Sequence, residues 1–129
     1  MKLLLDTHIW LWSVLEPHRL GPHTARELRN SENQIWLSPI SAWEALVLFD
    51  KGKIRLQGDP ASWVCAAMAP FQEAPLTHEI ALLARQLGLL QKDPADRFLA
   101  ATAKLLNLTL VTSDTRLLGL GEIATLANR

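Results

Sequence analysis

The sequence has almost no cysteine, no net charge and no long apolar run. Cys65 is the only cysteine, which excludes an internal disulfide and a cysteine-built zinc site and favours a reducing compartment. The 13 basic and 13 acidic side chains cancel, so no overall field draws the protein to nucleic acid or to an anionic membrane. Any polyanion must therefore be bound by a local group of residues.

No apolar run approaches the ~20 residues that a membrane span requires. The apolar start of the chain meets Asp6 too early for a signal peptide. We therefore expect a cytoplasmic protein without a membrane segment. A chain of 129 residues is long enough to bury one hydrophobic core, so residues 1–129 are predicted to form a single domain.

Short apolar runs alternate with helical patterns along the chain. The apolar runs predict strands at residues 3–5, 35–37, 73–76, 108–111 and 123–126. Between them, proline, glycine and capping residues delimit helices that open after Asp6 and cover residues 24–30, 39–50, 61–69, 77–87, 94–106 and a short stretch to 118. Because parallel neighbours need crossover connections, this order predicts an α/β fold, a three-layer α/β/α sandwich with a central parallel sheet.

The helix that starts at Pro94 carries the most informative pattern. Asp93 is predicted to cap its N-terminus, and proline suits its first position because that residue needs no N–H donor. Ala100 and Ala103 lie four and seven residues after Asp96, on the same face. This face can lie close against a sheet with one carboxylate projecting from its first turn. Alternatively, Asp96 only interacts with the helix dipole.

Two further aspartates follow predicted strands. Asp6 comes after the first strand and Asp114 after the strand at 108–111. Ligands of parallel sheets bind outside the carboxyl ends of the strands, so we expect both carboxylates at the same edge of the sheet. Each also has an alternative interpretation as the N-cap of the helix that follows it.

Glu44 lies within an apolar stripe of its predicted helix. Apolar residues stand at offsets of −4, −1, +3 and +4 from it, namely Ile40, Trp43, Val47 and Leu48. An unpaired carboxylate there costs several kcal/mol or takes up a proton. Either an arginine or lysine compensates it, or it shares a metal site with the other acids.

Together, Asp6, Glu44, Asp96 and Asp114 form a predicted acidic quartet at one edge of the sheet. Like charges about 5 Å apart repel by roughly 3 kcal/mol per pair at an effective dielectric of 20. Such a quartet therefore implies a hard divalent cation, and Mg²⁺, which prefers oxygen ligands, fits it.

Four motifs in order resemble those of the PIN domain family. They are Leu4-Leu5-Asp6-Thr7-His8, Ser38-Pro39-Ile40-Ser41-Ala42-Trp43-Glu44, Asp93-Pro94-Ala95-Asp96-Arg97-Phe98-Leu99-Ala100-Ala101 and Val111-Thr112-Ser113-Asp114. Within that family the chain is most similar to the VapC toxins of type II toxin–antitoxin pairs. The resemblance implies a PIN-like fold and a ribonuclease dependent on Mg²⁺ or Mn²⁺, with Asp6, Glu44, Asp96 and Asp114 as catalytic metal ligands and a VapB-type antitoxin as partner.

One position departs from that resemblance. Gln91 stands where many relatives have histidine, and we place it outside the metal shell. His8 and the cations Lys92 and Arg97 are candidates for RNA contacts, although a structural histidine and solvated cations are the commoner outcomes. The roles of Asp93 and Ser113 stay open. The five tryptophans are expected in the core or at an interface rather than as base-stacking platforms.

Three other functions compete with a nuclease. A phosphatase of the haloacid-dehalogenase type needs a second aspartate two residues after the first, where this chain has His8. A phospho-receiver domain needs neighbouring acids early in the chain and a lysine after a late strand. A catalytically weak PIN-like module that only binds a protein partner is the remaining alternative, and the intact acids argue against it.

The pattern also predicts partners. A neutral chain without a basic stripe favours single-stranded or looped RNA as substrate over a duplex. The helix at 40–49 is apolar on nearly every face, which is more than one sheet can bury, so we expect a homodimer that also binds its antitoxin.

Overall fold

The computed structural model describes residues 1–88 and 93–129. The predictions for Gln91 and Lys92 lie outside these ranges. The centre of the protein is a five-stranded sheet in the order β3-β2-β1-β4-β5, and every neighbouring pair of strands is parallel. The strands are β1 (Lys2–Leu5), β2 (Gln34–Leu37), β3 (Gln72–Glu73), β4 (Thr109–Thr112) and β5 (Ala124–Ala127). The parallel sheet predicted from the alternating pattern is confirmed.

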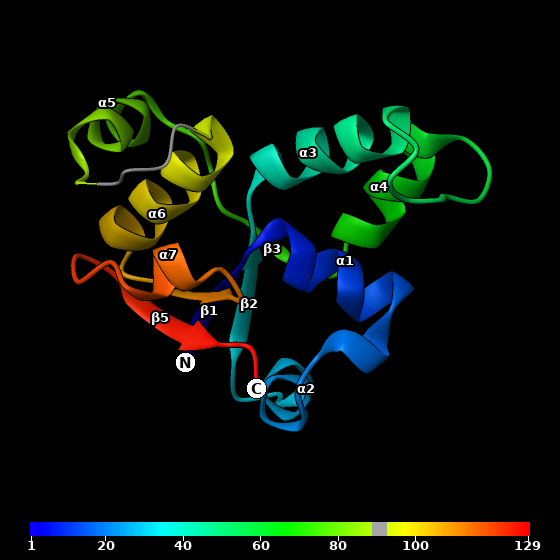
Figure 1. Cartoon of the computed structure of the whole chain (residues 1–129), viewed down its shortest axis with the longest axis horizontal. Coiled ribbons are helices and arrows are strands. Elements are labelled where there is room, and N and C mark those ends of the chain that lie inside the picture. Colours follow the sequence, from blue (N-terminus) through cyan, green and yellow to red (C-terminus); the bar gives the residue numbers. More distant parts are fainter. Residues whose placement is uncertain (89–92) are drawn as a thin grey trace.

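In the described residues, seven α-helices connect or follow these strands (Figure 1). They are α1 (Thr7–Leu15), α2 (Pro22–Arg29), α3 (Pro39–Asp50), α4 (Pro60–Met68), α5 (His78–Gln86), α6 (Pro94–Leu106) and α7 (Thr115–Leu118). Among the described residues, no helix is long and apolar enough to cross a membrane.

Local capping chemistry sets where several helices begin. The side chains of Asp59, Thr77 and Asp93 each accept a hydrogen bond from a backbone N–H in the first turn of α4, α5 and α6. Proline occupies the first position of α4 and of α6. The predicted cap Asp93 and the predicted start at Pro94 are both confirmed.

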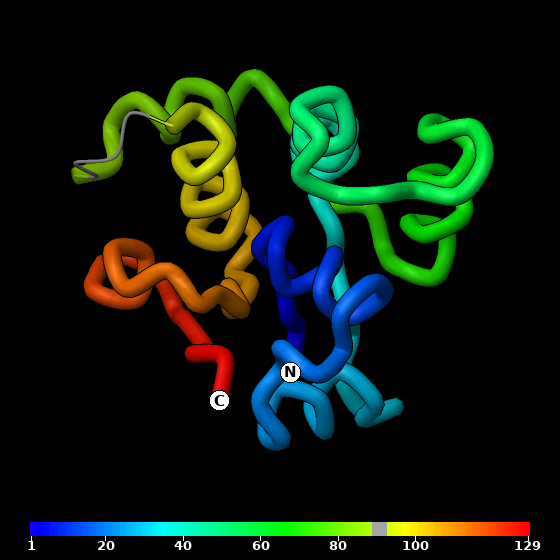
Figure 2. The backbone as a smooth tube through the Cα atoms, turned by 45° about the vertical axis from the view of Figure 1, so that its right-hand side comes forward, coloured from blue at the N-terminus to red at the C-terminus, as the bar shows by residue number. Residues whose placement is uncertain are grey.

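The side chains of the sheet divide into two hydrophobic clusters, one on each face. Leu3 and Leu5 of β1 belong to a cluster with residues of α1, α3 and α4. Leu4, which points to the opposite face because strand side chains alternate, belongs to a cluster with residues of α5, α6 and α7. Helices therefore cover both faces, and the predicted three-layer α/β/α sandwich is confirmed (Figures 1 and 2).

Helix α3 starts directly beyond the carboxyl end of β2 and contacts both α1 and α6. Ala100 and Ala103 of α6 are fully or almost fully buried, which agrees with the bare face expected for this helix. This close packing brings the first turns of α1, α3 and α6 toward the same edge of the sheet.

Several element bounds differ from the prediction by one or two residues, and two local details differ further. Residues Pro17–Arg19 form a 3₁₀ helix, η1, between α1 and α2. The sequence predicted only a break between helices there. Strand β3 spans Gln72–Glu73 instead of residues 73–76. It is short because Ala74 donates the last ladder bond to Leu37 and Pro75, which has no N–H, follows it.

Gly21 packs against the end of the chain, beside α2. Its N–H donates to the Asn128 side chain at 2.9 Å, and the Thr24 N–H donates to the Arg129 carbonyl at 3.0 Å. A Cβ atom on Gly21 would lie 1.8 Å from the carbonyl carbon of Arg129. The absence of a side chain at Gly21 therefore allows the two segments to touch.

We predict that Gly21→Ala and Gly21→Ser both destabilise the protein, by about 1–3 kcal/mol, because either Cβ forces the backbone of residue 129 to move. Serine is informative because it is a good N-cap and would stabilise α2 if capping decided the outcome. Chemical denaturation measures the effect. Gly121→Ala is the control, since a Cβ there meets nothing within 4 Å, and a Gly21→Ser protein as stable as wild type would contradict the close approach.

Candidate metal centre

Asp6 lies at the carboxyl end of β1. Its backbone N–H continues the sheet by donating to the Val111 carbonyl at 3.0 Å, and the residue is only 8% exposed. Asp6 occupies the N-cap position of α1, as its alternative interpretation predicted, but its carboxylate forms no side-chain capping bond to that helix. Instead it accepts a hydrogen bond of 2.6 Å from the hydroxyl of Thr112 at the end of β4. Burial raises the pKa of Asp6, and the Thr112 bond and nearby His8 oppose that rise.

Glu44 projects from α3 toward the start of α1. Its carboxylate accepts a hydrogen bond from the Thr7 hydroxyl, and Thr7 in turn lies 2.8 Å from the hydroxyl of Ser41. Within the described part of the chain, no lysine or arginine forms an ion pair with Glu44. Partial burial raises its pKa first, and the charges of Asp6 and Asp93 raise it further. In the described residues, the polar partner of the Glu44 carboxylate is therefore the hydroxyl of Thr7 and not a lysine or arginine.

Asp96 stands in the first turn of α6. Its pKa is raised from 3.8 to about 7, first by partial burial and then by four neighbouring carboxylates, those of Asp93, Asp6, Asp114 and Glu44. An acid whose charge is opposed by all three other members of the predicted quartet lies near each of them. The helix-dipole interpretation of Asp96 does not account for this coupling.

Asp114 has the role that its capping interpretation predicted, and a second one. Its carboxylate accepts a hydrogen bond of 2.9 Å from the Arg116 N–H and so caps α7. The same carboxylate forms an ion pair with the Arg116 guanidinium at 3.2 Å. The hydroxyl of Thr112 accepts from the Asp114 N–H at 3.0 Å. One threonine thus holds both aspartates that follow the central strands.

All four acids line one open cleft of about 480 Å³, which we call the carboxylate cleft. The remaining residues that line it are His8, Trp12, Arg19, Asp93, Ser113 and Arg116. Its lining residues come from the carboxyl edge of the sheet, where β1 and β4 end and where α1, α3 and α6 begin. Figures 1 and 2 show these elements meeting at that edge. The assignment of Asp6, Glu44, Asp96 and Asp114 as metal ligands stays a prediction.

Within residues 1–88 and 93–129, no three acidic, histidine or cysteine side chains stand close enough to hold a metal ion as they are. The carboxylates of Asp6, Glu44 and Asp114 turn to Thr112, Thr7 and Arg116 instead. Mutual repulsion favours this arrangement. The donor set nevertheless suits a hard cation, because it consists of carboxylate and hydroxyl oxygens in one cleft.

Sequence reasoning missed the hydroxyl groups that hold the acids. Thr7 and Thr112 are completely buried, as is Ser41. A signal for two of them was present, since Thr7 is adjacent to Asp6 and Ser41 lies three residues before Glu44 on the same helix. No local signal indicated Thr112, which binds a residue 106 positions away.

The secondary candidates have different surroundings. His8 is exposed on the cleft, and its ring lies 5.9 Å from that of Trp12. Arg97 is half-buried and donates to the Ala84 carbonyl at 2.9 Å and to Leu87 at 3.4 Å. This guanidinium ties α6 to the end of α5, so it is not the solvated cation that was expected. Asp93 and Ser113 are exposed at the cleft.

Comparison with solved structures identifies several with the same fold over nearly their whole length. VapBC2 from Rickettsia felis bound to a DNA fragment from its promoter has a TM-score of 0.73 at 18% identity and 98% coverage of each chain. FitAcB from Neisseria gonorrhoeae has a TM-score of 0.65 at 25% identity and 95% coverage of each. DNA-bound VapBC from Salmonella typhimurium has a TM-score of 0.66 at 17% identity, covering 100% of this chain and 99% of its own.

A search of curated protein sequences finds no significant match. The family comparison is decisive instead, since the PIN domain matches residues 3–123. That span includes the carboxyl ends of β1 and β4, the first turns of α1, α3 and α6, and every acid of the carboxylate cleft. The chain therefore belongs to the PIN domain family.

Proposed function

We propose that this protein is an Mg²⁺-dependent endoribonuclease and the toxin component of a type II toxin–antitoxin pair. The observation that carries the nuclease proposal is the carboxylate cleft, in which Asp6, Glu44, Asp96 and Asp114 come from four separate segments to one edge of the sheet. Membership of the PIN domain family supports it. The toxin proposal is supported by the similar structures, which include a toxin–antitoxin complex from Klebsiella pneumoniae at a TM-score of 0.64.

The four carboxylates would hold Mg²⁺ or Mn²⁺. When bound, such an ion supplies activation of a water molecule and neutralisation of charge on a phosphodiester. Thr112 and Thr7 orient Asp6 and Glu44 by donating hydrogen bonds to them. Asp96, whose pKa is about 7, gives up its proton readily near neutral pH when positive charge approaches. Arg19 and Arg116 line the same cleft and offer guanidinium groups to phosphate oxygens.

The first test is cleavage. We expect the protein to cut single-stranded RNA in Mg²⁺ or Mn²⁺ and to stop when EDTA is added. Glu44→Gln and Asp96→Asn should each lower the rate by at least about 100-fold, as loss of one transition-state-stabilising group does. Thr112→Val should lower it about 10- to 100-fold, the usual cost of losing a partner that orients a ligand. Gel assays of labelled RNA measure all three.

Asp59→Asn is the matched control for this experiment. It removes one carboxylate charge from an exposed position at the start of α4, and asparagine caps a helix as well as aspartate does. Its rate should equal that of wild type. Cleavage that survives EDTA would contradict the metal mechanism. Absence of cleavage at every Mg²⁺ and Mn²⁺ concentration would favour the alternative, a PIN-like module that only binds a protein partner.

Thermal melts test the shared metal site independently of activity. The pKa of Asp96 is raised from 3.8 to about 7 in the folded protein. The stabilisation from its bound proton is therefore complete below 3.8 and is lost as the pH rises through about 7. In EDTA we expect wild type to lose more stability than Asp96→Asn between about pH 5 and about pH 8, a range set by this shift.

At the upper pH in EDTA, Asp96→Asn and Glu44→Gln should be at least as stable as wild type, because each removes a repelling charge. Mg²⁺ should stabilise wild type by about 2.7 kcal/mol at a hundred times its dissociation constant, and the two variants much less. A shared metal site would be excluded if both variants melted below wild type in EDTA and Mg²⁺ raised the melting temperatures of all three proteins equally.

The proposed partners are a VapB-type antitoxin and a second copy of the chain. The similar structures support the first, since they include VapBC complexes from Rickettsia felis and Salmonella typhimurium and a toxin–antitoxin complex from Klebsiella pneumoniae. The surface of α3 supports the second. Trp43 is 60% exposed on that helix, although its indole ring is among the largest apolar groups that a protein can bury.

We predict that light scattering of the purified chain at micromolar concentration gives twice the mass of one chain. Trp43→Asp should shift the population to monomer because it places a charge in the apolar contact. Leu82→Asp is the control, since Leu82 is 67% exposed on a different helix, α5. A strictly monomeric wild type, or equal effects of the two substitutions, would count against this dimer.

A further inference from the structure

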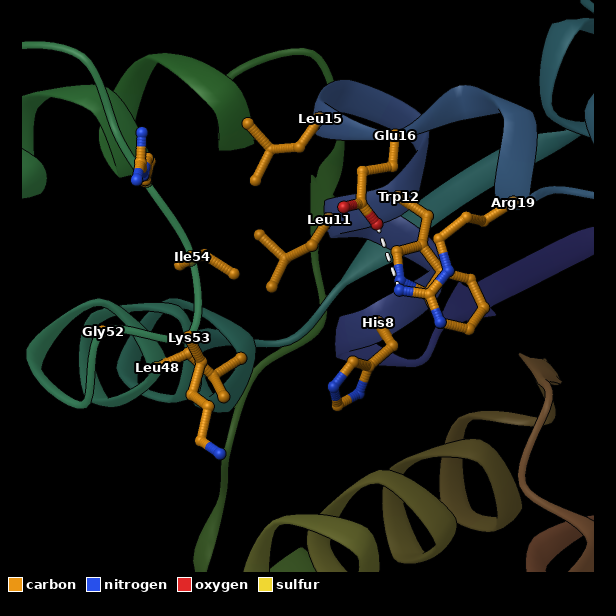
Figure 3. Close-up of a pocket in the computed structure, with 11 residues that line it drawn as sticks. His8, Leu11, Trp12, Leu15, Glu16, Arg19, Leu48, Gly52, Lys53 and Ile54 are labelled. Atoms are coloured by element: carbon orange, nitrogen blue, oxygen red, sulfur yellow. Dashed lines mark hydrogen bonds and ion pairs between the residues drawn. The ribbon is translucent and has the colours of Figure 1, made fainter.

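A second open space, which we call the flanking groove, lies beside the carboxylate cleft. It has a volume of about 520 Å³ and runs between α1 and the segment that follows α3 (Figure 3). Its floor is apolar. Leu11 and Leu15 of α1 point toward Ile54 across the groove, and Leu48 lies below them. The spacing of four residues between Leu11 and Leu15 sets both on one face of α1.

The rim of the flanking groove is basic. Arg19, Lys53 and Arg55 line it together with one carboxylate, that of Glu16. Glu16 forms an ion pair with Arg19 at 3.1 Å. Lys53 and Arg55 are exposed and form no ion pair with any residue in the described ranges. Three permanent cations against one carboxylate make this a positively charged site in a chain whose net charge is zero.

Arg19 is held in place on two sides. Its guanidinium carbon lies 4.3 Å from the centre of the Trp12 ring, and Glu16 accepts a hydrogen bond from the same group. A guanidinium fixed above an indole presents its outer face and its remaining N–H donors to solvent. Such a group can stack on a nucleobase or bind phosphate at little further cost in side-chain entropy.

The groove and the cleft share a wall. His8, Trp12 and Arg19 line both. An extended polymer can therefore run from the acidic cleft into the basic groove without leaving the protein surface. The volume of about 520 Å³ and the apolar floor suit a planar base, whereas the rim offers cations to the phosphates next to that base. A base can enter only if it is not stacked in a duplex.

We propose that the flanking groove binds the nucleotides next to the scissile phosphate of a single-stranded RNA. One unstacked base lies on the apolar floor and against the Trp12–Arg19 pair, and Lys53 and Arg55 contact the adjacent phosphates. This proposal rests on the proposed ribonuclease function, since it names the form of RNA that the carboxylate cleft receives. Charge complementarity favours RNA over an apolar peptide, which would use the floor and leave the cations of the rim unpaired.

Binding without catalysis tests the groove. Fluorescence polarisation of a labelled 12-nucleotide single-stranded RNA of mixed sequence, in EDTA, gives the affinity across a salt series. Each phosphate contact contributes about −0.7 to the slope of log K against log salt for a single strand. The double variant Lys53→Ala/Arg55→Ala should therefore bind more weakly than wild type, with a slope shallower by about 1.4.

Lys51→Ala is the matched control. Lys51 is exposed in the same segment but does not line the groove, so its removal should leave the salt slope nearly unchanged. Trp12→Leu tests the base-stacking contact while it keeps an apolar side chain. It should lower the affinity by about fivefold or more, the usual loss for one stacked base. Circular dichroism melts verify that each variant is folded.

The outcomes separate the two proposals. A shallower salt slope for the double variant, with no RNA cleavage in Mg²⁺, would support the groove and overturn the nuclease. Cleavage by wild type, with equal affinity and slope for wild type and the folded double variant, would overturn the groove and leave the nuclease intact. An unlabelled RNA duplex that competes as well as the single strand would also overturn the groove, because a stacked base cannot reach its floor.

Discussion

Repulsion between carboxylates is the constraint on which the edge of this sheet depends. Asp6, Glu44 and Asp96 are each at least partly buried, and the pKa of each is raised in part by the charges of its neighbours. A fold that only had to be stable would not gather such groups. Stability here comes from the two apolar clusters behind the sheet, which allow its edge to carry an unfavourable concentration of charge.

The zero net charge of the chain conceals a separation of charge along its surface. The carboxylate cleft collects acids from the ends of two strands and from two helices, while the neighbouring groove collects cations from η1 and from the segment after α3. Attraction for a polyanion is therefore local and directional. An extended anionic strand can be held on one side of the cleft and made to cross it, with no attraction elsewhere required.

Features that depend on neighbours in the chain could be predicted from the sequence, whereas contacts between distant residues could not. The cap Asp93 and the start at Pro94 depend on neighbours in the chain, so both could be predicted. The parallel sheet followed from the alternating pattern. Asp6 and Asp114 both occupy N-cap positions, yet only the side chain of Asp114 forms a capping bond. The carboxylate of Asp6 instead accepts a hydrogen bond from a threonine 106 residues away. A contact between residues so far apart in the chain gives no periodic pattern in the sequence.

The hydroxyl of Thr112 links two of the acids through a single atom. It donates to the Asp6 carboxylate and accepts from the Asp114 N–H, one residue beyond the point where Leu5 of β1 pairs with Val111 of β4. A slip of one residue between these strands would turn the hydroxyl to the opposite face of the sheet and break both bonds. A chain in which these two strands are misaligned therefore cannot bring Asp6 and Asp114 to the same hydroxyl.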